Sequence, residues 1–137
     1  MELPLEFSSR GTAITVSTEN VDANVEPDVS LCLFRVAQEG TQNAITHGGS
    51  RHVRIHLSGV GKMLTLTVED DGIGFDPGTG FGRGLGLMTI NERVVGVGGT
   101  LNVVSRLGSG THLSVSVPLA RGRHARDFVG SKMKDVS

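Results

Sequence analysis

The segment VEDDGIGFDPGTGFGRGLGLMTINERV, residues 68–94, joins two adjacent acids to a series of glycines and then to a helix-like stretch. Asp70 and Asp71 end an expected strand, and Gly72 and Gly74 follow with no side-chain bulk. A carboxylate at such an edge can accept a hydrogen bond from an exocyclic amine such as that of adenine. Because each glycine costs about 1 kcal/mol relative to alanine in a helix, we expect something to approach this backbone closely.

The sequence GRGLGL comes directly before the second expected helix. Its backbone N–H groups converge where the helix dipole is positive, which is typical of a phosphate site; they belong to Gly84, Leu85, Gly86 and Leu87. Together, a carboxylate that can bind a base and backbone amides that can bind phosphates predict a nucleotide pocket between the two motifs. Taken singly, each motif is more typical of an ordinary turn than of a nucleotide site.

Glu39, Asn43 and His47 recur at i, i+4 and i+8 within the first expected helix. This spacing places a carboxylate, an amide and an imidazole in one stripe. A polar stripe is usually the solvated face of a helix, but asparagine is a poor helix former. Its amide oxygen could ligate Mg²⁺, which keeps most of its waters and takes few protein ligands beside phosphates.

Alternating hydrophobic residues and turn signals predict the elements that hold these side chains. Strands are expected at 12–18, 52–57, 63–68, 100–106 and 111–118, and helices from a cap at Asp28 or Ser30 to His47 and over 87–94. The strands bury one face only, so both helices must cover that face. The expected fold is a two-layer α/β sandwich.

Hydrophobic periodicity also predicts the core. The first helix is expected to bury one face and the strands their alternate residues, and Cys32 is expected to be a buried thiol. The predicted core residues are Leu31, Phe34, Ala37, Thr41 and Ala44 on the helix, Val53, Ile55, Leu57, Leu64, Leu66 and Val68 on the strands, and Leu87, Ile90 and Val94 on the second helix.

Length and composition limit the classes of function that this chain could have. The 137 residues predict one domain over residues 1–120, and the polar, basic residues 121–137 are expected to be a disordered tail. A net charge of −1 gives no electrostatic reason to expect nucleic acid or an anionic membrane as a partner. No apolar stretch reaches the roughly 18 residues of a membrane span, and MELPLEFSSR lacks the features of a signal peptide, so we expect a cytoplasmic location.

Four motifs in register resemble one family. RVAQEGTQNAITHG, DDGIGF, GRGLGL with NERV, and GSGT are similar to the N box and glycine boxes of the ATP-binding domain of sensor histidine kinases. These kinases have the Bergerat (GHKL) fold, a mixed, mostly antiparallel sheet covered on one face by helices, shared with DNA gyrase, Hsp90 chaperones and MutL. The resemblance covers about residues 12–118 and is greatest to the subfamily of nitrate and fatty-acid-desaturase sensors.

The resemblance implies ATP and Mg²⁺ as cofactors and a role for each matching residue. Asn43 would ligate Mg²⁺, Glu39 would help with the metal or orient a nucleophile, and His47 would touch the phosphates. Asp70 would hold the adenine amine, with Thr111 beside it. The glycines would have three tasks: Gly72 and Gly74 would admit the base, Gly84 and Gly86 would wrap the phosphates, and Gly108 and Gly110 would shape a turn.

Two positions depart from the family pattern. Thr46 stands where the subfamily often has a basic residue, and Gly40 stands where the family usually has alanine. Arg83 is the nearest candidate to replace the lost phosphate contact. It ends the expected lid, Phe75 to Arg83, which should be mobile without ATP and better ordered with it.

The phosphoacceptor of such a kinase, a histidine usually followed by an acidic residue, has no match here; the five histidines precede Gly, Val, Leu, Leu and Ala. His52 and His56 are expected to be a solvated pair on the outer face of a strand, a face that His112 shares. The chain therefore resembles a catalytic domain whose phosphoacceptor helices would precede Met1. Its expected partners are that dimerisation domain and a response regulator.

Three alternatives stay open. An anti-sigma-factor serine kinase of this fold would phosphorylate a partner's serine. A gyrase-like ATPase would use Glu39 to activate water but would need a transducer domain and a longer lid. A nucleotide-sensing module without enzymatic activity is less consistent with the presence of the asparagine, the aspartate and both glycine loops.

Overall fold

The computed structural model describes residues 5–21, 24–75 and 86–119. In chain order, the elements of these residues are β1 (Leu5–Ser9), β2 (Thr12–Glu19), α1 (Pro27–Thr46), β3 (His52–Val60), β4 (Met63–Asp70), α3 (Leu87–Gly96), β5 (Thr100–Ser105) and β6 (Thr111–Pro118).

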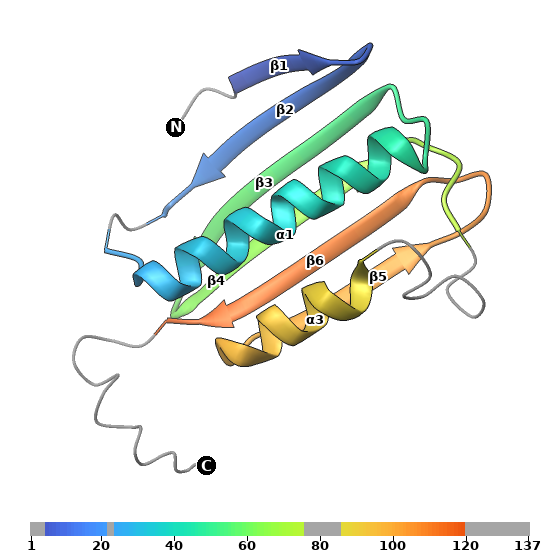
Figure 1. The fold of residues 1–137 in the computed structure, drawn as a ribbon. Coiled ribbons are helices and arrows are strands. Elements are labelled where there is room, and N and C mark those ends of the chain that lie inside the picture. The colour runs from blue at the N-terminus through green and yellow to red at the C-terminus, as the bar shows by residue number, and fades with distance from the viewer. Residues whose placement is uncertain (1–4, 22–23, 76–85, 120–137) are drawn as a thin grey trace.

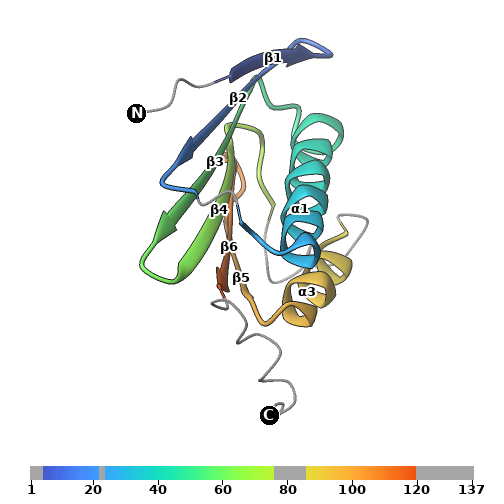
Figure 2. The same cartoon turned by 90° about the vertical axis from the view of Figure 1, so that its left-hand side faces the viewer.

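The strands form one six-stranded sheet in the order β1-β2-β3-β4-β6-β5. Only β2 and β3 pair in parallel among these neighbours, and α1 is the crossover that such a pair requires. Both helices of the described chain lie on the same face of the sheet (Figures 1 and 2). The two-layer sandwich with a mixed, mostly antiparallel sheet is therefore confirmed. Neither helix is both long and apolar enough to cross a bilayer.

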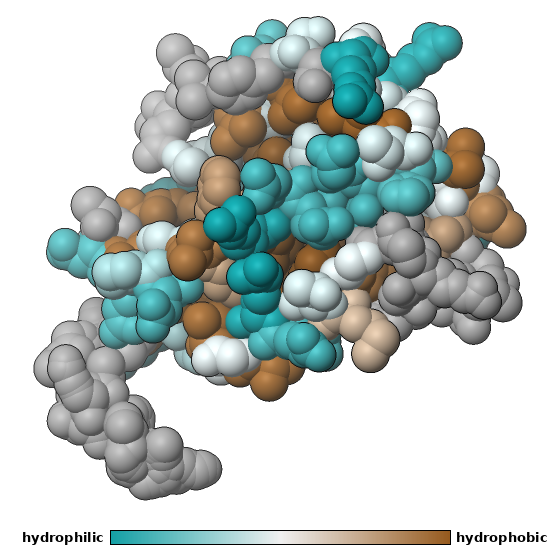
Figure 3. Space-filling view, viewed as in Figure 1, coloured by the Kyte–Doolittle hydropathy of each residue, from teal (hydrophilic) through white to brown (hydrophobic). Residues whose placement is uncertain are grey.

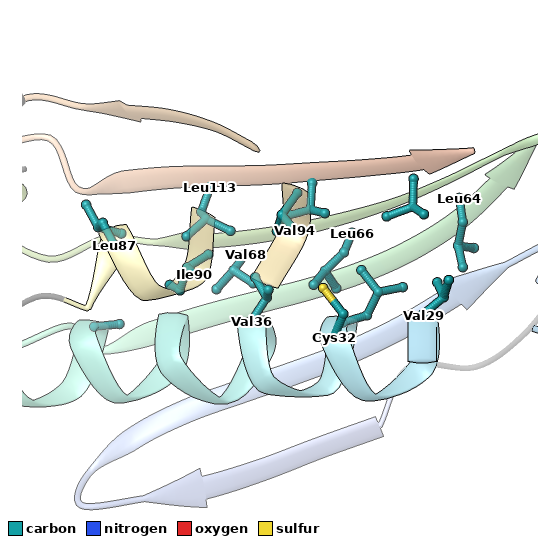
Figure 4. Close-up of a cluster of buried hydrophobic side chains, with 14 of the residues drawn as sticks. Val29, Cys32, Val36, Leu64, Leu66, Val68, Leu87, Ile90, Val94 and Leu113 are labelled. Carbon is teal, nitrogen blue, oxygen red and sulfur yellow. The ribbon is translucent and has the colours of Figure 1, made fainter. Parts of the chain in front are cut away.

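The core lies between the helices and the sheet (Figure 4). Its buried side chains come from both layers: Val29, Cys32, Leu33, Val36 and Ala44 of α1, Val53 of β3, Leu64, Leu66 and Val68 of β4, Leu87, Ile90 and Val94 of α3, and Leu113, Val115 and Val117 of β6. Ile55 and Leu57 are partly buried against this cluster. The predicted inward faces of the strands and of the second helix, and the buried Cys32, are confirmed.

β1 is a strand that the predicted elements lack. It pairs antiparallel with β2, with Leu5 opposite Val16, through a turn in which Arg10 and Gly11 have φ of 51° and 80°. A two-residue turn with both φ values positive matches the twist of a hairpin. The Arg10-Gly11 pair is the sequence feature that could have predicted this hairpin turn.

Two predictions for α1 are wrong. The helix begins at Pro27 with Glu26 as N-cap, so Asp28 and Ser30 lie inside the first turn; proline suits the first helical position because its φ is already helical. Leu31 and Phe34 do not enter the core, since they remain 53% and 58% exposed.

The core stripe of α1 explains the exposure of Leu31 and Phe34. It runs through Val29, Cys32, Val36, Gly40 and Ala44, so the Glu39, Asn43 and His47 stripe lies beside it rather than opposite. A hydrophilic band follows α1 on the surface (Figure 3). Phe34 borders an apolar groove of about 380 Å³ between α1 and strands β2 and β3.

Candidate nucleotide-binding site

A pocket of about 160 Å³ opens between the helical layer and the sheet. Its walls are Gly40, Asn43, Ala44, His47 and Gly48 from α1 and its end, Val68 and Asp70 from β4, Gly74 and Phe75, Leu87 from the start of α3, and Thr111 and Leu113 from β6. Apolar walls with a few convergent polar groups are typical of a small-molecule site. Asn43, His47, Asp70, Gly74, Leu87 and Thr111, all predicted from the sequence, meet here.

Asp70 lines the pocket, and the protein holds one of its two carboxylate oxygens. Oδ1 accepts hydrogen bonds from Ser50 Oγ at 2.9 Å and from the Gly72 amide at 2.8 Å. Oδ2 has no hydrogen-bond donor among the described residues. The carboxylate is thereby oriented, with acceptor capacity left for a donor on a ligand.

Asp71 has a different role from its neighbour. Its Oδ1 accepts from the amides of Arg51 and His52 at 2.8 and 3.0 Å, and its Oδ2 lies 2.8 Å from His52 Nδ1. These bonds, with that to the His52 ring the largest cause, lower the pKa of Asp71 from its ordinary 3.8 to about 2. Asp71 therefore ties the start of β3 to the end of β4 and does not line the pocket.

Thr111 lies directly opposite Asp70 on the neighbouring strand. Its hydroxyl is 2.8 Å from that of the buried Ser105, which also donates to the Gly110 carbonyl at 3.1 Å and accepts from the Phe75 amide at 2.9 Å. Ser105 thus fixes Phe75 as a wall of the pocket. No sequence pattern points to Ser105, because its partners are 5, 6 and 30 residues away in the chain.

The need for glycine at Gly72 and Gly74 comes from the packing of the protein against itself. A Cβ on Gly72 would lie 2.5 Å from Ser50 Oγ and 2.6 Å from the Gly48 carbonyl oxygen. Gly74 has φ of 67°, and a Cβ there would collide with the carbonyl of Arg106. Both glycines let chain segments meet behind the pocket, and this packing accounts for them without a ligand.

The α1 stripe reaches from the pocket to the start of α3. Asn43 and His47 line the pocket wall, whereas Glu39 lies farther along toward Gly86. A Cβ on Gly86 would be 2.7 Å from Glu39 Oε2, so the carboxylate contacts the residue that caps α3. An acid beside a helix N-terminus is electrostatically favourable, and the same amides can hold an anion.

Residues 28–121 match the family described as "Histidine kinase-, DNA gyrase B-, and HSP90-like ATPase". This is more than half of the chain, and it spans the pocket. The chain belongs to this ATPase family. Its relatives identify it as an ATP-binding catalytic domain of the sensor histidine kinase type.

Two curated relatives are histidine-protein kinase/phosphatases. DegS of Bacillus subtilis is 31% identical over 105 residues, which are 74% of this chain and 27% of DegS. UhpB of Salmonella typhimurium is 34% identical over 114 residues, 83% of this chain and 22% of UhpB. The chain thus spans about a quarter of the length of these relatives.

Among solved structures, the histidine kinase domain of the blue-light activated histidine kinase EL346 from Erythrobacter litoralis has the same fold. It superposes with a TM-score of 0.65 and 27% identity, covering 77% of this chain and 55% of that one.

Part of the predicted site of this ATPase domain lies outside the described residues. Arg83, Gly84 and Leu85 fall there, as does the expected lid after Phe75. Their roles stay predictions, as do the nitrate-sensor subfamily and the tail over 121–137.

The histidines on the open face of the sheet of the ATPase domain pair separately. His52 pairs with Asp71, His56 contacts Ser17 and Glu19, and His112 lies 2.7 Å from Glu69. No group of three or more His, Cys, Asp or Glu side chains that could hold a metal occurs in the described part of the chain. His52 and His56 therefore bind different partners rather than each other.

Proposed function

We propose that this domain binds ATP with Mg²⁺ and donates the γ-phosphate to a histidine on a dimerisation and phosphoacceptor domain outside the chain. The observation that carries the proposal is the oriented carboxylate of Asp70 in an apolar pocket, with Asn43 across it on α1. Residues 1–120 are the proposed extent of the domain. A response regulator is the proposed downstream partner, and the cytoplasm, which holds ATP, is the proposed location.

The base lies at the sheet end of the pocket in this proposal. Asp70 Oδ2 accepts a hydrogen bond from the exocyclic amine of adenine, while Val68 and Leu113 form the apolar walls around the ring. Thr111, opposite Asp70, adds a polar group at the same edge.

The phosphates extend toward the start of α3 in this proposal. The amides at Gly86 and Leu87 are near the positive end of the α3 dipole and can bind an anion. Asn43 supplies one amide oxygen, which fits Mg²⁺ because this ion takes most of its ligands from water and phosphate. Bound there, Mg²⁺ would neutralise charge on the phosphates.

The chemistry is a phosphoryl transfer. A ring nitrogen of the acceptor histidine forms a bond to the γ-phosphorus as the bond to the bridging oxygen of ADP breaks, and positioning supplies most of the catalysis. Glu39, the stripe residue that contacts Gly86, can orient the incoming imidazole or support the metal. The imidazole proton leaves to solvent.

The test is phosphotransfer from γ-labelled ATP to an isolated histidine phosphoacceptor domain. We expect label on histidine, which is acid-labile and stable to base, and a loss of at least about 100-fold for Asn43→Ala with its circular dichroism unchanged. Asn102→Ala, an equivalent change on the exposed part of β5, should keep full activity. Label that enters only water or serine, or an Asn43→Ala variant that is unfolded, would contradict these assignments.

A serine kinase of the anti-sigma-factor type is the second candidate. The site would bind ATP in the same way, so the acceptor alone separates the two. DegS and UhpB are both histidine-protein kinase/phosphatases, which favours histidine.

A further inference from the structure

Ser50 contacts Asp70 although it lies 20 residues earlier in the chain. Its side chain is buried, with 5% of the residue exposed, and its hydroxyl donates to Asp70 Oδ1 at 2.9 Å. Ser50 itself does not line the pocket. Any effect that it has on a ligand must therefore act through the aspartate.

The backbone of Ser50 is fixed at both of its polar atoms. Its amide donates to the carbonyl of Ala44 at 3.0 Å, at the end of α1, and its carbonyl accepts from the hydroxyl of Thr12 at 2.7 Å, at the start of β2. The Ile73 amide donates to Gly48, two residues earlier, at 3.0 Å. Backbone bonds to the end of α1 and to the start of β2 thus hold Ser50 where its hydroxyl reaches Asp70.

The contact leaves little freedom to the carboxylate. Ser50 Oγ and the Gly72 amide both donate to Oδ1, and a side chain at Gly72 would displace the hydroxyl because its Cβ would lie only 2.5 Å from Ser50 Oγ. With one oxygen held by two donors, the rotation of the carboxylate is restricted. The carboxylate, which lines the pocket, is therefore oriented before any ligand arrives, and this lowers the entropic cost of binding.

We propose that Ser50 is a positioning residue that makes the site selective for bases carrying an exocyclic amine. The inference rests on the proposed function, because it requires a nucleotide in this pocket. Without the hydroxyl, the carboxylate can turn and Oδ1 gains a free acceptor site, so the preference for an amine at one place in the pocket weakens. The residue acts on discrimination between bases more than on phosphate binding.

Calorimetric titration with ADP and with inosine diphosphate tests this directly. Inosine carries a carbonyl where adenine carries the amine, so the wild-type domain should prefer ADP by at least about tenfold. Ser50→Ala should reduce this ratio by about fivefold to tenfold. If that variant does not fold, Ser50→Cys keeps the volume, replaces the hydroxyl with a weak donor, and should show the same loss.

Thr12→Val is the matched control. It removes a buried hydroxyl that bonds the carbonyl of Ser50 but does not contact Asp70. The Ser50 amide stays bonded to Ala44 and the Ser50 hydroxyl to Asp70, so the ratio should stay within about twofold of wild type. In an Asp70→Asn background, Ser50→Ala should cause no further loss of the ratio. A wild-type ratio in Ser50→Ala, or an equal loss in Thr12→Val, would overturn the role of Ser50 while nucleotide binding stands. A wild-type domain that binds neither nucleotide would instead overturn the proposed function.

Discussion

Asp70 and Asp71 are consecutive residues whose side chains leave the end of β4 toward opposite faces of the sheet. Leu64, Leu66 and Val68 precede Asp70 on the inner face at a period of two, so its carboxylate reaches the pocket. Asp71 points away and finds the amides at the start of β3. Asp70 is available to a ligand, whereas Asp71 joins the end of β4 to the start of β3.

The lowered pKa of Asp71 predicts a pH dependence of stability. Its contribution is fully present above about pH 4, near the unfolded pKa of 3.8, and is lost as the pH falls toward the folded value of about 2. Asp71→Asn lacks this titration. The difference in unfolding free energy between wild type and variant should shrink between pH 4 and 2, as measured by denaturant titration at each pH; a difference that stays constant over this range would contradict the prediction.

At the scale of elements, the turn between β5 and β6 packs against the end of β4 that carries Asp70. Gly108 and Gly110 both have positive φ, of 87° and 79°, but their surroundings differ. A Cβ on Gly108 meets no atom within 4 Å, whereas one on Gly110 would collide with the carbonyl of Asp70. Gly108 is needed for its backbone angle alone, and Gly110 also for the approach of β4.

Alanine at each glycine should separate these two effects. Gly108→Ala should cost about 1 kcal/mol of stability for the left-handed conformation and leave ADP affinity unchanged. Gly110→Ala should cost more than about 2 kcal/mol and weaken ADP binding, because the end of β4 must move with Asp70. Thermal unfolding of both variants would measure stability, and calorimetric titration would measure ADP affinity. Equal effects of the two substitutions would mean that the contact of Gly110 with Asp70 does not contribute to stability or binding.

At the scale of the whole molecule, the pocket joins both layers. Its walls come from α1, α3, β4 and β6, which are assembled only in the native state. A ligand that binds there must therefore stabilise the fold by mass action.

ADP with Mg²⁺ at 100 times its dissociation constant should stabilise the domain by about 2.7 kcal/mol and raise its melting temperature by about 5–10 °C. Asp70→Ala, which removes a hydrogen bond to a charged group worth about 1.5–3 kcal/mol, should lose more than half of this shift at the same concentration. Differential scanning calorimetry would measure both proteins with and without nucleotide. An equal shift in the variant would exclude Asp70 from the base site.

Features with a local physical cause could be read from the sequence. Alternation along β3 and β4 gave the buried face, and the spacing of Leu87, Ile90 and Val94 gave the inner face of α3, because period and burial are linked within one element. The four motifs, in their order along the chain, predicted the ATPase family to which the chain belongs. The stripe of Glu39, Asn43 and His47 was also evident, since residues four apart share one face of a helix.

What depends on contacts between distant segments was decided only by the tertiary structure. The rotation of α1 left Leu31 and Phe34 exposed, because the sheet beneath it, and not its own hydrophobicity, selects the buried stripe. Ser50 and Ser105 are ordinary loop and strand residues by sequence, yet their hydroxyls orient Asp70 and anchor Phe75. A short polar side chain has no periodic signature, so its role is set by which residue the fold brings within 3 Å of it.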